Sequence, residues 1–298
     1  MKKIESAIDE MLVRRLLAAQ FPEWGDLPIE PVVVSGWDNR TFHLGENMLV
    51  RMPSATDYAL QVEKEQQWLP RLAPLLPLPI PAPLAVGEPA EGYPWKWSIY
   101  RWIEGDTAAV GHITNLEGFA TSLAEFLTAL QSIDSSGGPP PGLHSFYRGG
   151  LLSTYDAETR EAITVLTGKI DVDAATEVWE TALATTWQSS PVWVHGDVSA
   201  GNLLIKEGRL CAVIDFGQLT VGDPACDLAI AWTMFRGESR KIFRKMLPLD
   251  AGTWERGRAW CLWKGLIVCA SLAGTNPLEI EKSRLVIDEV IADYKHER

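Results

Sequence analysis

The feature that most constrains the fold is the stretch at residues 192–217, which reads VWVHGDVSAGNLLIKEGRLCAVIDFG. Its β-branched and aliphatic runs predict three short strands, at 192–195, 203–205 and 210–214, inside a region whose pattern is otherwise helical. Asp197 follows the first strand, Asn202 lies five positions later, and Asp215 follows the third strand directly before Phe-Gly. We therefore expect a small island of β-structure that carries polar side chains at its strand ends.

This set of side chains is the one that phosphoryl transfer requires. A nucleoside triphosphate arrives with magnesium, so the site needs oxygen ligands for the metal and a carboxylate that orients the incoming hydroxyl and accepts its proton. Asp215 and Asn202 suit the metal, and Asp197 suits the hydroxyl. In the alternative interpretation Asp197 and Asn202 only shape a turn and Asp215 caps a loop. Each motif alone is short, but their order and spacing together favour phosphoryl transfer.

With these motifs the chain resembles the aminoglycoside phosphotransferase-like enzymes, small-molecule kinases that share the bilobal protein-kinase-like fold, along nearly its whole length. The resemblance implies that Asp197 is the catalytic base, that Asn202 and Asp215 bind Mg²⁺, and that ATP, or alternatively GTP, is the phosphate donor. The run GDPACDLA at 222–229 also resembles the family. By this resemblance Asp227 braces the catalytic loop, whereas Asp223 is interpreted as a helix cap.

The expected fold class is α+β, with a small antiparallel sheet followed by a mostly helical region. Strands are predicted at 31–35, 41–44, 48–52, 84–87 and 95–102, and helices beside them at 1–20 and 57–72. Further helices are expected at 115–132, 151–167, 173–188, 223–236, 239–247, 253–273 and 277–295. We place a nucleotide-covering lobe at 1–103, and a helical lobe with the catalytic loop, metal site and acceptor pocket at 104–298.

The amino-terminal lobe departs from the protein-kinase pattern at the phosphate-binding cation. Where that pattern has a lysine on the third strand, the run MLVRMP offers Arg51. An arginine is permanently charged and binds phosphate or carboxylate through two parallel hydrogen bonds, so it can serve with a different geometry. Its partner on the following helix is predicted to be Glu65, with Glu63 as the alternative because the helix register is open.

The phosphate loop and the hinge carry weaker signals. The run SGWDNRT has a single glycine, so a Gly-x-Gly-x-x-Gly cradle is absent, although backbone amides of a tight turn can still bind phosphate. Additional phosphate contacts are assigned to Ser35, Asn39 and Thr41. The run at 99–102 resembles the hinge whose backbone binds a purine, and it assigns base contacts to Ile99, Tyr100 and Trp102. Nothing in it separates adenine from guanine.

Composition narrows the partners and the location. The 298 residues carry a formal net charge of −12, which disfavours a nucleic-acid partner and is compatible with a cationic ligand or with solubility alone. No apolar run approaches the length of a membrane span, and the first residues, MKKIESAIDEM, do not form a signal peptide, so we expect a cytoplasmic protein without a membrane partner. The four separated cysteines favour neither a zinc site nor a disulfide framework.

The expected acceptor is the hydroxyl group of a small molecule, and its identity stays open. Only a short segment follows Gly217 before the next helix, without Ala-Pro-Glu, so the long activation segment of a protein kinase is absent. The first hypothesis is an antibiotic-resistance kinase for an aminoglycoside or a macrolide, with a cationic acceptor favoured by the negative charge. Alternatives are a metabolic kinase for a sugar, an amino alcohol or an amino acid, and a nucleotide-binding regulator without turnover. The sequence does not indicate the oligomeric state.

Overall fold

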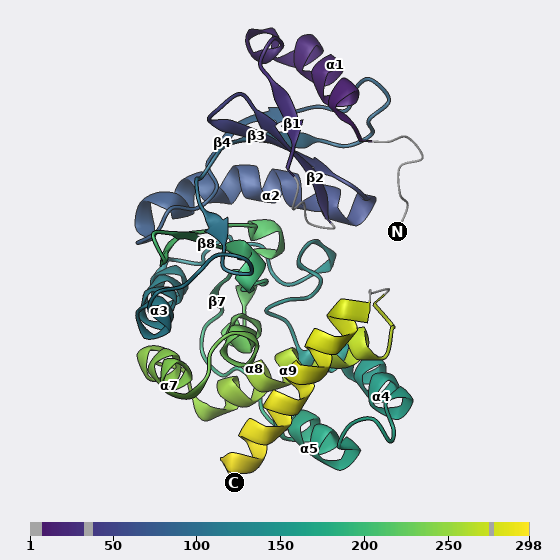
Figure 1. Cartoon of the computed structure of the whole chain (residues 1–298), viewed down its shortest axis with the longest axis vertical. Helices are drawn as coiled ribbons and strands as arrows, with labels where there is room; N and C mark the ends of the chain where they lie inside the picture. Colours follow the sequence, from purple (N-terminus) through teal and green to yellow (C-terminus); the bar gives the residue numbers. More distant parts are fainter. Residues whose placement is uncertain (1–7, 33–37, 274–276, 298) are drawn as a thin grey trace.

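The computed structural model describes residues 8–32, 38–273 and 277–297, and it contains an antiparallel sheet followed by a helical region, as expected (Figure 1). The sheet has the strand order β1-β2-β3-β5-β4. Helix α1 covers its outer face, and α2 covers the face toward the helical region (Figure 1). The bounds here are α1 (Glu10–Gln20), β1 (Ile29–Pro31), β2 (Asn39–Leu44), β3 (Met48–Pro53), α2 (Thr56–Leu72), β4 (Pro83–Gly87) and β5 (Trp97–Arg101).

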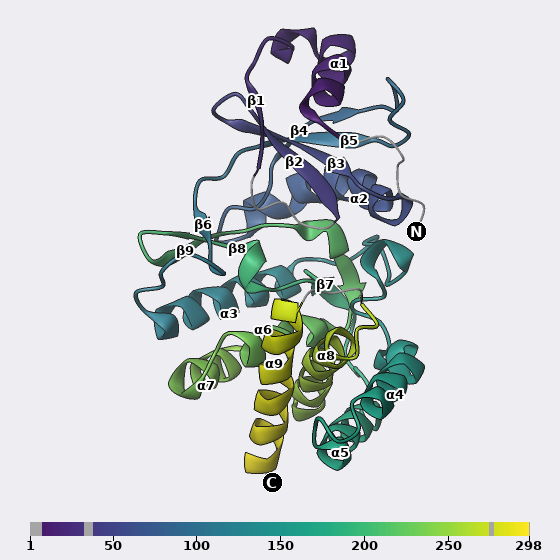
Figure 2. The same cartoon turned by 45° about the vertical axis from the view of Figure 1, so that its right-hand side comes forward.

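The second part of the chain is mostly helical, with short strands among the helices. Strands β6, β8 and β9 form a small antiparallel sheet between α2 and α3, and β7 pairs with β10 (Figure 2). The helices are α3 (Leu116–Ser132), α4 (Asp156–Val165), α5 (Val172–Leu183), α6 (Ile230–Thr233), α7 (Gly237–Met246), α8 (Ala251–Cys269) and α9 (Pro277–His296). The strands are β6 (Asp106–Thr107), β7 (Val192–Val194), β8 (Leu203–Lys206), β9 (Arg209–Val213) and β10 (Thr220–Gly222).

The predicted elements recur with three differences. The helix expected at 223–236 is mostly the tighter 3₁₀ segment η7 (Pro224–Ala229), because Pro224 and the cap Asp223 begin it and short 3₁₀ turns serve as connectors. The strands β6 and β10 were not predicted, since each has only two or three residues. The first helix begins at Glu10 with Asp9 as its cap, and most of the strand expected at 31–35 lies outside the described residues.

Two apolar clusters hold these layers together. One lies between α1 and the outer face of the sheet, where Leu16, Val50 and Ile99 are fully buried. The larger cluster fills the helical region, and it also contains Trp68 of α2 and Tyr100 of β5. Helix α2 therefore connects the sheet to the helical region by apolar contact as well as by the polar contacts described below.

Within the described residues, no helix is long and apolar enough to span a membrane.

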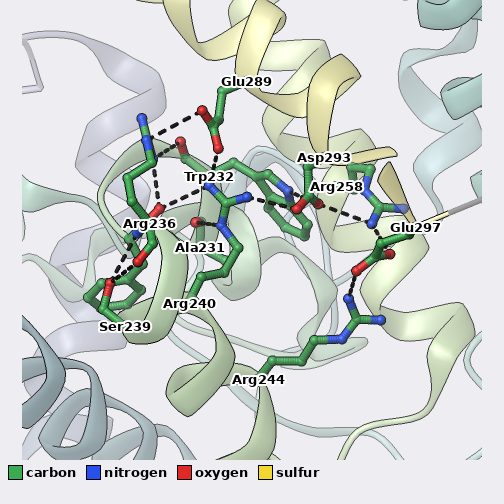
Figure 3. A network of polar contacts seen from close by, with 11 residues as sticks. Ala231, Trp232, Arg236, Ser239, Arg240, Arg244, Arg258, Glu289, Asp293 and Glu297 are labelled. Atoms are coloured by element: carbon green, nitrogen blue, oxygen red, sulfur yellow. Dashed lines mark hydrogen bonds and ion pairs between the residues drawn. The ribbon is translucent and has the colours of Figure 1, made fainter. Parts of the chain in front are cut away.

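A network of ion pairs fixes α9 against α7 and α8 (Figure 3). Arg240 contacts Asp293 at 2.8 Å and also pairs with Glu289. Arg258, whose side chain is 1% exposed, contacts Asp293 at 3.2 Å and Glu297 at 2.5 Å. A buried ion-pair network is costly to break, because removal of one member leaves its partners charged and poorly solvated. Helix α8 also carries Trp260 and Trp263, whose rings contact the guanidinium of Arg148, so this network also holds the helix that packs on that arginine.

Arg258→Met is expected to lower the free energy of unfolding by about 3 kcal/mol, because it removes the buried cation that Glu255, Asp293 and Glu297 share. Urea unfolding followed by fluorescence measures this change. Arg244→Met is the matched control: Arg244 pairs with the same Glu297 but its side chain is 38% exposed, so the loss should stay within about 1 kcal/mol. Equal losses in the two variants would contradict a special role for the buried member.

Candidate active site

The catalytic loop is held in place by a buried carboxylate. Asp227, which is fully buried in η7, accepts hydrogen bonds from the backbone N–H groups of His195 at 2.9 Å and Gly196 at 2.7 Å. Gly196 has φ +89°, and a Cβ there would lie 2.6 Å from the carbonyl oxygen of Gln218, so this turn requires glycine. The contacts agree with the bracing role that the sequence resemblance implied for Asp227.

The predicted base and one predicted metal ligand are in direct contact. The Nδ2 group of Asn202 donates to the backbone oxygen of Asp197 at 2.9 Å and to its Oδ2 at 3.0 Å. His195 donates from Nε2 to the carbonyl of Ile214, so its Nδ1 is the acceptor of the Asp197 backbone N–H. These bonds orient the Asp197 carboxylate and use the Nδ2 group of Asn202, whose amide oxygen is of the ligand type that suits a hard cation.

Arg51 links the sheet to the second aspartate. Its guanidinium contacts Glu65 of α2 at 3.1 Å and Oδ1 of Asp215 at 2.5 Å. The hydroxyl of Tyr100 donates to the other oxygen of Glu65 at 2.6 Å, which fixes that carboxylate from the strand side. Glu63 instead pairs with Lys96 at the surface. The structure therefore selects Glu65 from the two candidates that the sequence left open.

The pKa values of the two aspartates, Asp197 and Asp215, are shifted in opposite directions. Burial alone would raise the pKa of Asp215, but the adjacent guanidinium of Arg51 lowers it below its usual value. Burial raises the pKa of Asp197, and the charge of Asp215 raises it further, although Arg148 and Lys264 oppose this. A raised pKa makes Asp197 the stronger base of the pair, whereas Asp215 stays ionised.

Of the three residues predicted to bind phosphate, the structure describes Asn39 and Thr41. Ser35 lies outside the described residues. Asn39 is buried at the start of β2, and Thr41 lies opposite Arg51 in the antiparallel pairing of β2 with β3. Because alternate residues of a strand share one face, Thr41 and its directly opposite partner Arg51 lie on the same face of the sheet. The roles of Asn39 and Thr41 in phosphate binding stay predictions.

The structure corrects the hinge assignment in part. Ile99 and Tyr100 are buried in β5, which is paired with β3 on one side and β4 on the other, so their backbone groups belong to the sheet and do not face a base. Tyr100 acts through its hydroxyl on Glu65. Trp102 follows the strand, and its ring lies 4.2 Å from that of His43, although its backbone N–H donates to Asn47. The error arose because sequence pattern places the end of a strand only within a few residues.

Two charged residues of this region were not found from the sequence. Lys64 precedes Glu65 and is buried, with its Nζ at 2.8 Å from Nδ1 of His144 and at 2.8 Å from the carbonyl oxygen of Gly217. Burial lowers the pKa of Lys64 to about 7. Asp38 lies near both aspartates, and burial together with the charge of Asp215 raises its pKa to about 6. Only the folded chain brings these groups together, so no local pattern signals them.

Comparison with known proteins then identifies the family. A model of the phosphotransferase enzyme family matches residues 30–260. The chain belongs to this family. The matched range contains all but the first residue of the sheet, together with α2, the catalytic loop and Asp215, whereas Lys264 lies just beyond it. The resemblance drawn from the sequence motifs is thereby confirmed, as is the expected fold class.

Relatives with known activities match over part of their length. An aminoglycoside 3'-phosphotransferase of Escherichia coli is 35% identical over 89 residues, which are 26% of this chain and 33% of that protein. A hygromycin-B 4-O-kinase of Escherichia coli is 28% identical over 203 residues, which are 63% of this chain and 59% of that protein. The matches thus span between a third and three fifths of these two relatives.

Solved structures share the fold along almost the whole chain. The GDP complex of wild-type aminoglycoside 2'-phosphotransferase-IIIa has a TM-score of 0.71 at 17% identity, and the match covers 96% of this chain and 99% of that one. A macrolide 2'-phosphotransferase from Brachybacterium faecium, solved as the apoenzyme, has a TM-score of 0.62 at 19% identity, with 92% and 98% covered. At such identities these likenesses establish the fold.

Proposed function

We propose that this protein transfers the γ-phosphate of a nucleoside triphosphate, with Mg²⁺, to a hydroxyl group of a small molecule. The observation that carries the proposal is the convergence of Asp197, Asn202 and Asp215 with the Arg51–Glu65 pair. These are the groups that phosphoryl transfer uses for proton acceptance, metal binding and phosphate binding. Family membership supports the same chemistry, and relatives have been solved with GDP, ADP and ATP.

The donor set fits magnesium. Asp215 supplies a carboxylate that its lowered pKa keeps ionised, and Asn202 supplies an amide oxygen, both hard ligands of the kind that Mg²⁺ prefers. Three carboxyl groups, those of Asp38, Asp197 and Asp215, lie close together, and after burial it is the charge of Asp215 that most raises the pKa values of the other two. A divalent cation bound there would offset this repulsion and neutralise the phosphates of the donor.

The residues of this chain then have separate tasks. Asp197 orients the acceptor hydroxyl and accepts its proton, and Asn202 holds that carboxylate through its Nδ2 group. Arg51 binds phosphate oxygens while Glu65 keeps its guanidinium in place. Lys64 donates to the carbonyl of Gly217, two residues after Asp215, and so ties α2 to the segment that carries this carboxylate. The catalytic work is positioning and charge stabilisation.

Arg51→Ala is expected to weaken triphosphate binding about tenfold or more and nucleoside binding little, because a charge-assisted hydrogen bond is lost only from the phosphates. Arg51→Lys should recover part of the loss. Calorimetric titration with a non-hydrolysable triphosphate and with the nucleoside measures both. Arg15→Ala removes an exposed arginine from α1 and should change neither affinity. Triphosphate affinity that is equal in Arg51→Ala and wild type would reassign Arg51 to holding Glu65 and Asp215.

The proposed class of acceptor is inferred from the names of the related proteins. Their names point to aminoglycosides, hygromycin B and macrolides, so antibiotics of these types are the first acceptors to test. One observation favours the metabolic alternative: Arg148 and Lys264 both lower the pKa of Asp197, so the region beside the base is not purely electronegative. A cationic acceptor therefore gains less local attraction than the net charge of −12 suggests.

The test is phosphate transfer from ATP and GTP to a panel of hydroxyl compounds, read by the mass of the product. The panel contains aminoglycosides, macrolides, sugars, amino alcohols and hydroxy amino acids. Formation of a phosphate ester by wild type but not by Asp197→Ala is expected. Nucleotide binding without transfer to any member would favour the regulator without turnover, and absence of nucleotide binding would overturn the proposal.

Two further proposals concern the boundary between the lobes and the location of the protein in the cell. The nucleotide-covering lobe would comprise residues 1–103, since β6 directly after it pairs with β8 of the helical region. The helical lobe would comprise 104–298 and carry the acceptor pocket. We also propose a cytoplasmic location, where nucleoside triphosphate and magnesium are supplied. Fractionation of cells with an antibody against the protein tests the location.

A further inference from the structure

The helical region contains two cations near Asp197 that the proposed mechanism does not use. Arg148 lies in the loop before α4, and Lys264 lies on α8 with an exposed side chain. Neither forms an ion pair with a carboxylate within the described residues. The Nη1 atom of Arg148 is buried and has no hydrogen-bond partner in that part of the chain. A buried donor without an acceptor costs free energy, so its retention calls for an explanation.

Aromatic side chains surround the guanidinium of Arg148, whose Nη1 donor has no partner among the described residues. The group lies 4.9 Å from the ring centre of Trp260 and 4.7 Å from that of Trp263, both on α8. Tyr155 packs 4.2 Å from Trp263 and completes the aromatic wall. Cation–π contacts of this kind fix the position of a guanidinium while its charge and its N–H groups stay available. Trp263 in turn donates to Glu158, which orients its ring.

Backbone contacts place this cluster beside the catalytic loop. The carbonyl of Gly149, next to Arg148, accepts from the N–H of Asp223, and a Cβ on Gly149 would lie 2.8 Å from Thr220 of β10. Strand β10 pairs with β7, which leads directly to Asp197. Lys264 directly follows Trp263 on α8, the residue whose ring contacts Arg148. The electrostatics agree, because desolvation and then the charge of Arg148 lower the pKa of Lys264, whereas Asp197 raises it. Arg148, Lys264 and Asp197 therefore share one region.

The proposed reaction brings anionic phosphate groups to this region, and they need cations. The loop at 197–202, DVSAGN, contains no lysine or arginine. Arg51, from the opposite side, is already shared between Glu65 and Asp215. Phosphoryl transfer spreads negative charge over the non-bridging oxygens of the moving group, and fixed cations stabilise that charge. On this basis, and resting on the proposed function, we propose that Arg148 and Lys264 form an oxyanion subsite beside Asp197. Its ligand is either the terminal phosphoryl group of the donor or an anionic group of the acceptor.

Binding and kinetic measurements on Lys264→Met and Arg148→Gln test the subsite and separate the two sources. If it takes the terminal phosphoryl group, each variant weakens binding of a magnesium-bound non-hydrolysable triphosphate about tenfold, and leaves the diphosphate unchanged. If it takes the acceptor, nucleotide affinities stay as in wild type. The KM for a hydroxyl acceptor that carries a carboxylate or phosphate then rises about tenfold, with no change for a neutral acceptor. Lys264→Arg should restore most of either loss.

Lys241→Met is the matched control, because Lys241 lies on α7 and its side chain is 76% exposed. The proposal is overturned if Lys264→Met and Arg148→Gln resemble this control in every binding constant, or if they change only the pH profile of kcat through Asp197. That result leaves phosphoryl transfer itself intact. If instead wild type transfers no phosphate, calorimetry with inorganic tripolyphosphate still decides: weaker binding by both variants than by Lys241→Met supports the subsite, and equal binding removes it.

Discussion

Asp197→Ala is expected to lower kcat by about two to four orders of magnitude, the usual worth of a positioned general base, and to leave the Kd of the nucleotide nearly unchanged. The reason is geometric. Asp197 is oriented by Asn202 and by the backbone of its own loop, and in the part of the chain that the structure describes no hydrogen bond or ion pair joins it to Arg51, the proposed phosphate ligand. Single-turnover rates measured at saturating nucleotide and acceptor report this loss directly.

The control for this variant separates chemistry from loop structure. Asp227→Asn keeps the base but weakens the buried acceptor that holds the N–H groups of His195 and Gly196. It should lower the melting temperature as well as kcat, whereas Asp197→Ala should leave the melting temperature equal to or above that of wild type, because a carboxylate with a burial-raised pKa is removed. Near wild-type turnover by Asp197→Ala on the true acceptor would contradict its role as the base.

The sequence predicted the parts of the site that depend on short spacing. Asp197, Asn202 and Asp215 occur within nineteen positions on one strand-turn-strand segment, so local geometry alone brings them near one another. The same holds for the sheet and most helices, whose apolar periodicity decides which face is buried. The base contacts assigned to Ile99 and Tyr100 did not take account of β5, in which both residues pair with a strand on each side.

The parts that could not be predicted depend on contacts across long sequence separations. Lys64 meets His144 and Gly217 only after α2 packs on the helical region. Arg148 contacts Trp260 and Trp263, which lie more than a hundred positions later in the sequence. The sequence pattern alone predicts only that these tryptophans belong to the core. A lone charged side chain carries no periodic signal, so its function appears only when its partners, or their absence, are seen in three dimensions.

Asp215→Ala is expected to remove the magnesium-dependent part of nucleotide affinity, because the metal bridges the phosphates to this carboxylate. In wild type, Mg²⁺ should strengthen triphosphate binding substantially, and in the variant affinities with and without Mg²⁺ should converge. Titration of a non-hydrolysable triphosphate, with Mg²⁺ or with a chelator, measures both. Asp223→Asn is the control, since Asp223 also pairs closely with an arginine, Arg256, but is not among the proposed metal ligands.

The ion pair between Arg51 and Asp215 adds a signature that a structural role would not produce. In the absence of Mg²⁺, Asp215 both occupies Arg51, at 2.5 Å, and repels the phosphates by its own charge. Its removal releases the guanidinium and lowers that repulsion, so metal-free triphosphate binding by Asp215→Ala should equal or exceed that of wild type. The double variant with Arg51→Ala should lose this gain. If Mg²⁺ strengthens binding by the same factor in Asp215→Ala and wild type, Asp215 is not a metal ligand and serves only to hold Arg51.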